Sequence, residues 1–101
     1  MIVRVWHCWT SIENADKLEY LLRTEIFVGI KNRNIPGLND IKLLKKTDGD
    51  EIEFLILVYF SSMDSVKIFA GENYETPIVP EKVGALLTSY DKISLHYEIV
   101  V

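Results

Sequence analysis

The chain is poor in the residue types that build disulfide frameworks, metal sites and phosphate-binding loops. Its one cysteine, Cys8, has no partner for an internal disulfide and no second cysteine to complete a zinc ligand set. No Gly-rich phosphate loop and no paired metal motif occurs among the 101 residues. The longest apolar run, Phe54 to Phe60, is far shorter than the ~20 residues of a membrane span. We therefore expect a soluble protein with no metal site and no nucleotide chemistry.

Basic residues are scarce as well. The net charge is −4, and no run of Lys or Arg is longer than the pair Lys45-Lys46, so nucleic acids and anionic membranes are not expected as partners. The opening residues MIVRVWHCW show neither a basic region nor an apolar segment followed by small residues, which predicts no secretory signal and a cytoplasmic location. The length predicts a single domain over residues 1–101.

What the chain does have is regular hydrophobic periodicity. Strands are predicted where apolar or bulky residues run together, and helices where apolar residues recur at intervals of three and four. Thr10 or Ser11 can cap the first helix, with Glu13 in capping-box position, and Ser61 with Asp64 repeats this pattern. The expected strands are residues 2–10, 41–46, 52–60 and 93–101, and the expected helices are residues 12–32, 63–70 and 80–90.

This order predicts an α+β protein with a ferredoxin-like βαββαβ arrangement and an antiparallel four-stranded sheet. Right-handed crossovers place the last and third strands beside the first, and leave the second, with Lys42, Lys45 and Lys46, on an edge. Helices in this fold cover one face of the sheet, whereas the third strand (IEFLILVYF) is apolar on both faces. We therefore expect a homodimer in which a second copy covers the other face.

Specific stretches connect this arrangement to a family. In order, they are VWHCWT, SIENADKLEYLLRTEIF, EIEFLILVYFSSMDSVKIFAGENYETPIVP and LHYEIV, and they span nearly the whole chain. Together they resemble the antibiotic biosynthesis monooxygenase family, whose members pair two ferredoxin-like protomers into a dimeric α/β barrel. The resemblance implies that fold and that dimer here. A fold alone does not fix a reaction.

The resemblance also implies a kind of chemistry. Family members that oxidise polycyclic aromatic compounds work without metal or flavin, in an apolar pocket between sheet and helices, which implies no cofactor here. Heme-degrading relatives use a polar residue on the first strand, a tryptophan on the helix after the third strand and an iron-ligating histidine shortly beyond. In this chain His7 has the first-strand place, but Phe69 stands near the expected tryptophan and no histidine lies between His7 and His96. That arrangement is therefore incomplete.

His7 and His96 are the candidate catalytic pair. The last strand is expected beside the first and antiparallel to it, so the two imidazoles could share a pocket and serve as general base and proton donor. Strand alternation puts His7 on one face with Trp9, and Arg4 on the other. The alternative is that each histidine is a hydrogen-bonded core or interface residue. A metal site of His7, His96 and Glu98 is compatible with this alternation, and nothing else supports it.

Aromatic residues are the candidates for substrate contact. The family resemblance places the pocket near Tyr59, Phe69 and Tyr74, around the third strand, the short helix and the loop after it. We take Trp9, Tyr59 and Phe69 as candidate substrate-binding residues, and Tyr74, a loop residue with a hydroxyl, as a third candidate catalytic residue. The alternatives are core packing for Trp9 and lid packing for Tyr74. Arg4 could offer a charge to an acidic substrate, or stack on a neighbouring ring.

Three functions stay open at this point. The leading hypothesis is a small dimeric oxygenase-like enzyme that acts on a small aromatic or quinol-type substrate without a bound cofactor. The second is a non-enzymatic binding or stress-associated protein that sequesters a hydrophobic ligand in the same pocket. The third is a heme protein.

Overall fold

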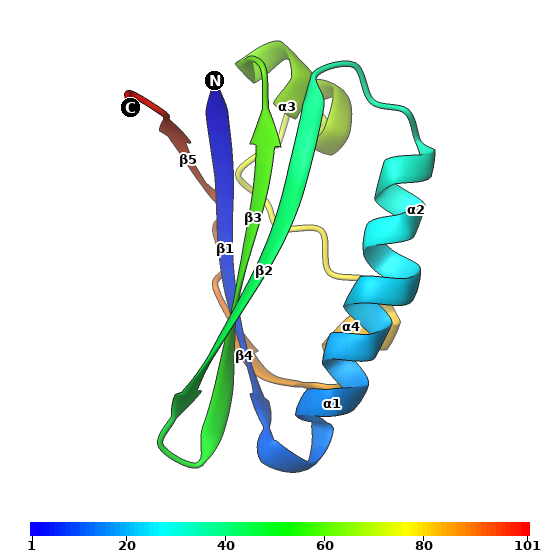
Figure 1. Ribbon diagram of the computed structural model, residues 1–101, viewed down its shortest axis with the longest axis vertical. Coiled ribbons are helices and arrows are strands. Elements are labelled where there is room, and N and C mark those ends of the chain that lie inside the picture. Colours follow the sequence, from blue (N-terminus) through cyan, green and yellow to red (C-terminus); the bar gives the residue numbers. More distant parts are fainter.

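The computed structural model describes residues 1–101, and its sheet is built around β1 (Ile2–Ser11; Figure 1). Along β1, buried side chains alternate with partly exposed ones. β3 (Glu51–Phe60) pairs antiparallel with the whole of β1, and β2 (Leu38–Asp48) pairs antiparallel with the other edge of β3. The two-residue loop of this hairpin begins at Gly49, whose φ of 63° is the left-handed conformation that favours glycine.

The other neighbour of β1 is divided between two short strands. β4 (Leu87–Tyr90) pairs with the C-terminal end of β1, and β5 (Leu95–Glu98) pairs with its N-terminal part. Both are antiparallel to β1, so the sheet order is the one that the crossovers predict, with β2 on an edge. The α+β class and the ferredoxin-like arrangement are thus confirmed, with five strands in place of four.

The prediction of a helix over residues 80–90 is wrong beyond its first turn. α4 (Glu81–Gly84) is a single turn, and the chain then enters β4. The apolar residues that suggested one helical face reach the same buried cluster from a turn followed by a strand; they include Val83, Leu87 and Tyr90. Hydrogen bonding to β1 decides the outcome, because the hydroxyl and aromatic residues of β4 have little intrinsic preference for a helix.

One long helical segment follows β1. It consists of α1 (Ile12–Leu21), the π-helical turn η1 (Leu22–Ile26) and α2 (Phe27–Asn32). The backbone N–H of Phe27 reaches the carbonyl of Leu22, five residues earlier, so this turn holds one residue more than an α-helical turn. The predicted helix is therefore present over its full length, with an irregular turn in the middle.

Serine side chains begin two of the helices. Ser11 caps α1, because its hydroxyl accepts a first-turn backbone N–H, whereas Thr10 is fully buried and donates its hydroxyl to a backbone carbonyl. Ser62, and not Ser61, caps α3 (Met63–Ala70) in the same way. In both helices the capping residue is thus the one that follows the first candidate in the sequence.

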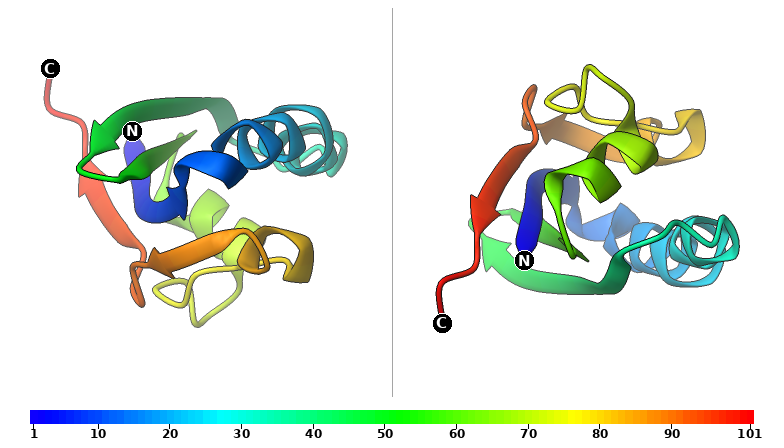
Figure 2. Two further views of the ribbon diagram at one scale, coloured as in Figure 1. Left: turned by 90° about the horizontal axis from the view of Figure 1, so that it is seen from below. Right: turned by 90° about the horizontal axis from the view of Figure 1, so that it is seen from above.

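The helices all lie on one face of the sheet, which we call the helix face (Figure 2). The core fills the space between this face and the helices, and its largest fully buried side chains include Phe54, Phe60 and Leu18. No helix crosses the opposite face, which we call the open face. The open face is formed by Val3, Val5, His7 and Trp9 of β1 with Glu53, Leu55, Leu57 and Tyr59 of β3. None of the helices is long and apolar enough to cross a membrane.

Candidate ligand pocket

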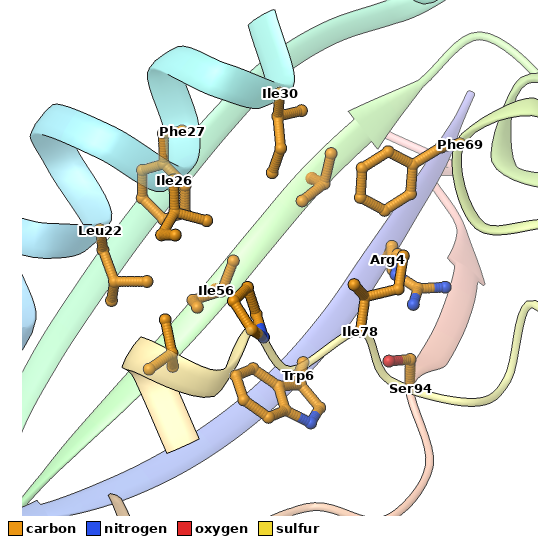
Figure 3. A pocket seen from close by; sticks show the side chains of 13 residues that line it. Arg4, Trp6, Leu22, Ile26, Phe27, Ile30, Ile56, Phe69, Ile78 and Ser94 are labelled. Atoms are coloured by element: carbon orange, nitrogen blue, oxygen red, sulfur yellow. The ribbon is translucent and has the colours of Figure 1, made fainter. Parts of the chain in front are cut away.

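A cavity of about 70 Å³ lies between the helix face and the helices (Figure 3). Trp6 and Ile56 line it from the sheet, Ile26 lines it from η1, and Phe69 lines it from α3. Ten of its thirteen lining residues are hydrophobic, and the others are a proline, a serine and an arginine. The cavity is thus an apolar space with very few polar groups.

Arg4 is the charged residue of this lining, and only 5% of its surface is exposed. Its guanidinium donates from Nη1 to the carbonyl of Tyr74 and from Nη2 to the carbonyl of Thr76, and Nη1 lies 3.0 Å from Nε2 of His96. The guanidinium carbon also lies 5.5 Å from the centre of the Phe69 ring. Burial lowers the pKa of Arg4 to about 10, which still leaves it charged at neutral pH.

His96 lies opposite Arg4 in the register between β5 and β1. Because a guanidinium only donates hydrogen bonds, Nε2 of His96 is the acceptor, and the proton of the neutral ring is on Nδ1. Burial, and then the charge of Arg4, lower the pKa of His96 to about 4, so the imidazole is neutral at pH 7. Tyr74 meets this imidazole edge-on, with the ring centres 5.2 Å apart. Both aromatic residues therefore position the guanidinium.

A more open groove of about 370 Å³ adjoins the cavity. Its lining residues are Met63, Tyr74, Glu75, Ser94, Leu95 and His96. Ser94 is almost fully buried and lines both spaces, and Arg4 meets His96 at the same boundary. The apolar cavity and the more polar groove can therefore be treated as two parts of one candidate site.

A second polar cluster lies on the open face, around His7. Nδ1 of His7 is 2.8 Å from Oδ2 of Asp91, and the same oxygen accepts the backbone N–H of His7. Nε2 of His7 is 3.9 Å from a carboxylate oxygen of Glu53, and the Trp9 ring stacks on the imidazole with the centres 6.0 Å apart. Asp91 lies in the break between β4 and β5, so the interruption of this edge of the sheet places its carboxylate beside His7.

The structure divides the predicted site residues into two groups. Phe69 lines the cavity, and Tyr74 and His96 line the adjoining groove. The other three, His7, Trp9 and Tyr59, have the opposite parity on their strands and lie on the open face. No contact or shared pocket joins the two groups.

The expected pocket shared by the two histidines is therefore not formed. His96 pairs with Arg4, which points to the helix face, whereas His7 points away from it. The alternative metal site with Glu98 is absent too, since no three His, Cys, Asp or Glu side chains come together in a way that could hold a metal ion.

Some residues of these clusters carry no signal of their own in the sequence, among them Asp91, Ser94 and Ile78. Asp91 and Ser94 belong to the break between β4 and β5, where the sequence predicts the junction of a helix over residues 80–90 and a strand over residues 93–101. Ile78 lies in a loop that carries no periodicity. Strand parity places Arg4 on the same face of β1 as Trp6, and the structure shows that this is the helix face.

Comparison with solved structures identifies the fold. A mutant of MhuD with two manganese protoporphyrin IX molecules bound per active site matches with a TM-score of 0.67 and 17% sequence identity, over 100% of this chain and 96% of that chain. The heme degrader MhuD from Mycobacterium tuberculosis, with two hemes bound in its active site, matches with a TM-score of 0.66 and 16% identity, over 100% and 97%. A candidate antibiotic biosynthesis monooxygenase from Bacillus cereus matches with a TM-score of 0.64 and 14% identity, over 99% and 93%. No family model and no curated protein matches the chain.

The chain is therefore an α+β protein with the ferredoxin-like fold of these structures. The resemblance inferred from the sequence is confirmed at the level of the fold, since the structural match includes a candidate antibiotic biosynthesis monooxygenase and spans the whole domain. Because one fold hosts many reactions, the reaction has to be argued from the site.

Proposed function

We propose that the protein is a monooxygenase-like enzyme that binds a small aromatic or quinol-type compound in the cavity between the sheet and the helices. The observation that carries the proposal is the cavity lining, in which ten of thirteen residues are hydrophobic and one is a buried arginine. Apolar walls with a few placed polar groups are the usual construction of a small-molecule site. The fold shared with monooxygenase structures supports an oxygenase reaction.

Such a reaction can take its electrons from the substrate. A substrate that loses two hydrogen atoms and gains one oxygen atom gives up four electrons, which is the number that O₂ takes up. One oxygen atom of O₂ enters the product, and the other leaves as water with the two hydrogen atoms. In this scheme the apolar walls exclude water, the Phe69 ring contacts the substrate, and Tyr74 and His96 border the mouth. The predicted cytoplasmic location is compatible with the free, buried Cys8, which needs no oxidising compartment.

The donor set of the cavity does not fit heme. No histidine lines the cavity: His96 accepts a hydrogen bond from Arg4 outside it, and His7 lies on the open face. Titration with hemin is accordingly expected to give no Soret shift beyond that of a non-binding control protein.

Binding without turnover is the second candidate function. The observation that favours it is that no histidine or tyrosine side chain lines the cavity, so no general base touches a ligand there. A protein of this kind would sequester the same apolar compounds and leave them unchanged.

Oxygen uptake and ligand binding together separate the two functions. With a panel of hydroquinones and anthrones, we expect oxygen uptake above the uncatalysed rate, and its loss in Ile26→Trp, which fills the cavity. Ile68→Trp is the matched control, because Ile68 is exposed on α3 outside the cavity. Saturable binding without oxygen uptake would favour sequestration, and absence of both would refute a function at this cavity.

The open face leads us to propose a homodimer as well. Leu44, Leu95 and Tyr97 on this face are 45%, 45% and 53% exposed, and they flank the apolar residues of β1 and β3 on both sides. On β2, Lys42 and Lys46 share this face with Leu44. Contiguous exposed apolar surface of this kind marks an interface, and a two-fold dimer would bury it sheet to sheet. In that arrangement His7, Trp9 and Tyr59 belong to the interface, which we propose as their role.

Light scattering after size exclusion tests this assembly. At micromolar concentration the native chain is expected to elute as a dimer, and Leu57→Glu, at the centre of the open face, as a monomer. Ile68→Glu adds the same charge at an exposed site on the helical side and should leave the dimer intact. A native monomer under these conditions would contradict the assembly.

A further inference from the structure

Arg4 is a buried cation without an anionic partner. Six contacts between basic and acidic side chains lie within ion-pair distance, two of them made by His7, and none of the six involves Arg4. Its contacts are two backbone carbonyls, one neutral imidazole and the face of one aromatic ring. Glu75 lines the neighbouring groove and makes no ion pair with it. Buried charges are normally paired, because removing an isolated charge from water is costly.

Arg4 also has hydrogen-bonding capacity left over. A guanidinium carries five N–H donors. The bonds to Tyr74, His96 and Thr76 use both donors of Nη1 and one of Nη2. The Nε–H and one N–H of Nη2 remain, so the guanidinium has donors left for the two oxygens of a carboxylate.

The position of the group links this capacity to the cavity. Arg4 lines the cavity together with Phe69 and Ser94 (Figure 3), and Ser94 also lines the groove. The remaining walls are apolar, so an anion there would be attracted in a medium of low polarity, where the interaction is stronger than in water. A purely structural role, holding the loop carbonyls of Tyr74 and Thr76, would use some donors and leave the charge uncompensated.

We propose that the ligand of this pocket is a monoanion, an aromatic ring bearing one carboxylate, with the carboxylate bound by Arg4 and the ring in the apolar cavity, which widens from about 70 Å³ to admit it. This inference rests on the proposed function for the location of the ligand and adds its charge and functional group. His96 and Tyr74 act as positioning residues, because the imidazole of His96 and the carbonyl of Tyr74 both bind the guanidinium and fix its place at the cavity wall.

Binding of three probes to the native protein tests the proposal. Benzoate and benzamide have nearly the same shape and differ in charge, and toluene lacks the polar group. By calorimetry at low salt, benzoate is expected to bind about tenfold or more tightly than benzamide, as a charge-assisted bidentate contact predicts. In ¹⁵N spectra of the native protein, benzoate is expected to shift the Nε–H signal of Arg4, and benzamide to leave it nearly in place.

Two substitutions localise the effect. Arg4→Met should reduce the preference for benzoate over benzamide to about onefold, that is, to no preference. Arg33→Met is the matched control: the Arg33 guanidinium lies 5.3 Å from the same Phe69 ring but outside the cavity lining, so the preference should persist. If Arg4→Met does not fold, the Nε–H shift in the native protein decides alone.

The outcomes separate failure of this inference from failure of the proposed function. Equal binding of benzoate and benzamide, or binding of toluene alone, would overturn the anionic ligand and leave the pocket standing. No binding of any of the three probes would refute the pocket, and the inference with it. A benzoate preference that survives Arg4→Met would also overturn the assignment.

Discussion

Replacing Phe69 with alanine should lower the stability of the protein and at the same time enlarge its cavity. The ring is 9% exposed, lies 5.6 Å from the Phe60 ring, and has the guanidinium groups of Arg4 and Arg33 on it at 5.5 and 5.3 Å. Its loss removes buried apolar area, one aromatic pair and two cation–π contacts. The same ring lines the cavity, so the space it leaves joins an existing void.

The expected loss of stability can be derived from core substitutions of the same kind. Phe→Ala substitutions in protein cores cost about 3–5 kcal/mol. One side of the Phe69 ring already borders a void, so it has fewer packing partners than an enclosed ring, and we expect the lower half of that range, about 3–4 kcal/mol. In a domain of this size each kcal/mol shifts the melting temperature by about 4–8 °C, so a decrease of at least about 12 °C should follow.

Urea unfolding, followed by tryptophan fluorescence, measures the loss of stability. Calorimetry with toluene measures whether the enlarged cavity binds an apolar ring. A cavity of about 150 Å³ lined by apolar side chains accepts benzene. The present cavity of about 70 Å³ has to widen for such a ring, so toluene should bind more tightly to Phe69→Ala than to the native protein.

Val66→Ala is the control for this prediction. Val66 is fully buried on the same helix but does not line the cavity. Loss of its two methyl groups should cost about 2 kcal/mol without any gain in toluene binding. A cost for Phe69→Ala below that of Val66→Ala, or a full cost with no gain in binding, would refute the placement of this ring between core and cavity.

Three further predictions concern single groups. The pKa of His96 lies near 4 in the folded chain and near 6.5 in the unfolded chain, so as the pH falls from 6.5 to 4 the unfolded state takes up the proton first. The melting temperature of the native protein should therefore fall between pH 6.5 and pH 4, and that of His96→Gln should fall less. Equal changes of melting temperature with pH in the two proteins would contradict this prediction. Cys8, whose pKa burial raises to about 12, should react with a thiol reagent at pH 8 only after unfolding, and fast reaction of the native protein would show that the strand is accessible. Ser62→Ala should lower the stability by about 1 kcal/mol, because α3 loses its N-cap, and Ser61→Ala should lower it much less. A larger loss for Ser61→Ala in chemical unfolding would show that Ser61 is the cap.

The first sixty residues show what local pattern can predict. β1, the long helical segment and the β2–β3 hairpin follow from apolar runs, helical spacing and a glycine turn, because each element carries its own signal. The order of strands in the sheet then follows from handed crossovers. Strand parity separated His7 from Arg4 correctly, but the sequence could not say which of the two faces the helices would cover.

Residues 80–98 show where local pattern fails. Val83, Leu87 and Tyr90 fit a helical face and also fit a turn followed by a strand, and only the open edge of β1 decides between them. The break after β4 places Asp91 beside His7 and Ser94 between cavity and groove, so both polar clusters depend on a tertiary choice. For this reason the predicted pairing of the two histidines was wrong, although His96 lies on the expected strand.

The π-helical turn η1 marks a place where the chain can lose one residue without moving the pocket. The turn from Leu22 to Ile26 is wide enough to hold one additional residue, so the α2 residues Phe27 and Ile30 keep the orientation toward the cavity that an unbroken α-helix would also give them. Deleting one residue there would restore a regular α-helix, and Phe27 and Ile30 would still line the cavity. A deletion within the regular turns of α1 would instead rotate everything beyond it by about 100°. In descendants of this sequence, loss of one residue should be tolerated at this turn far more readily than in α1.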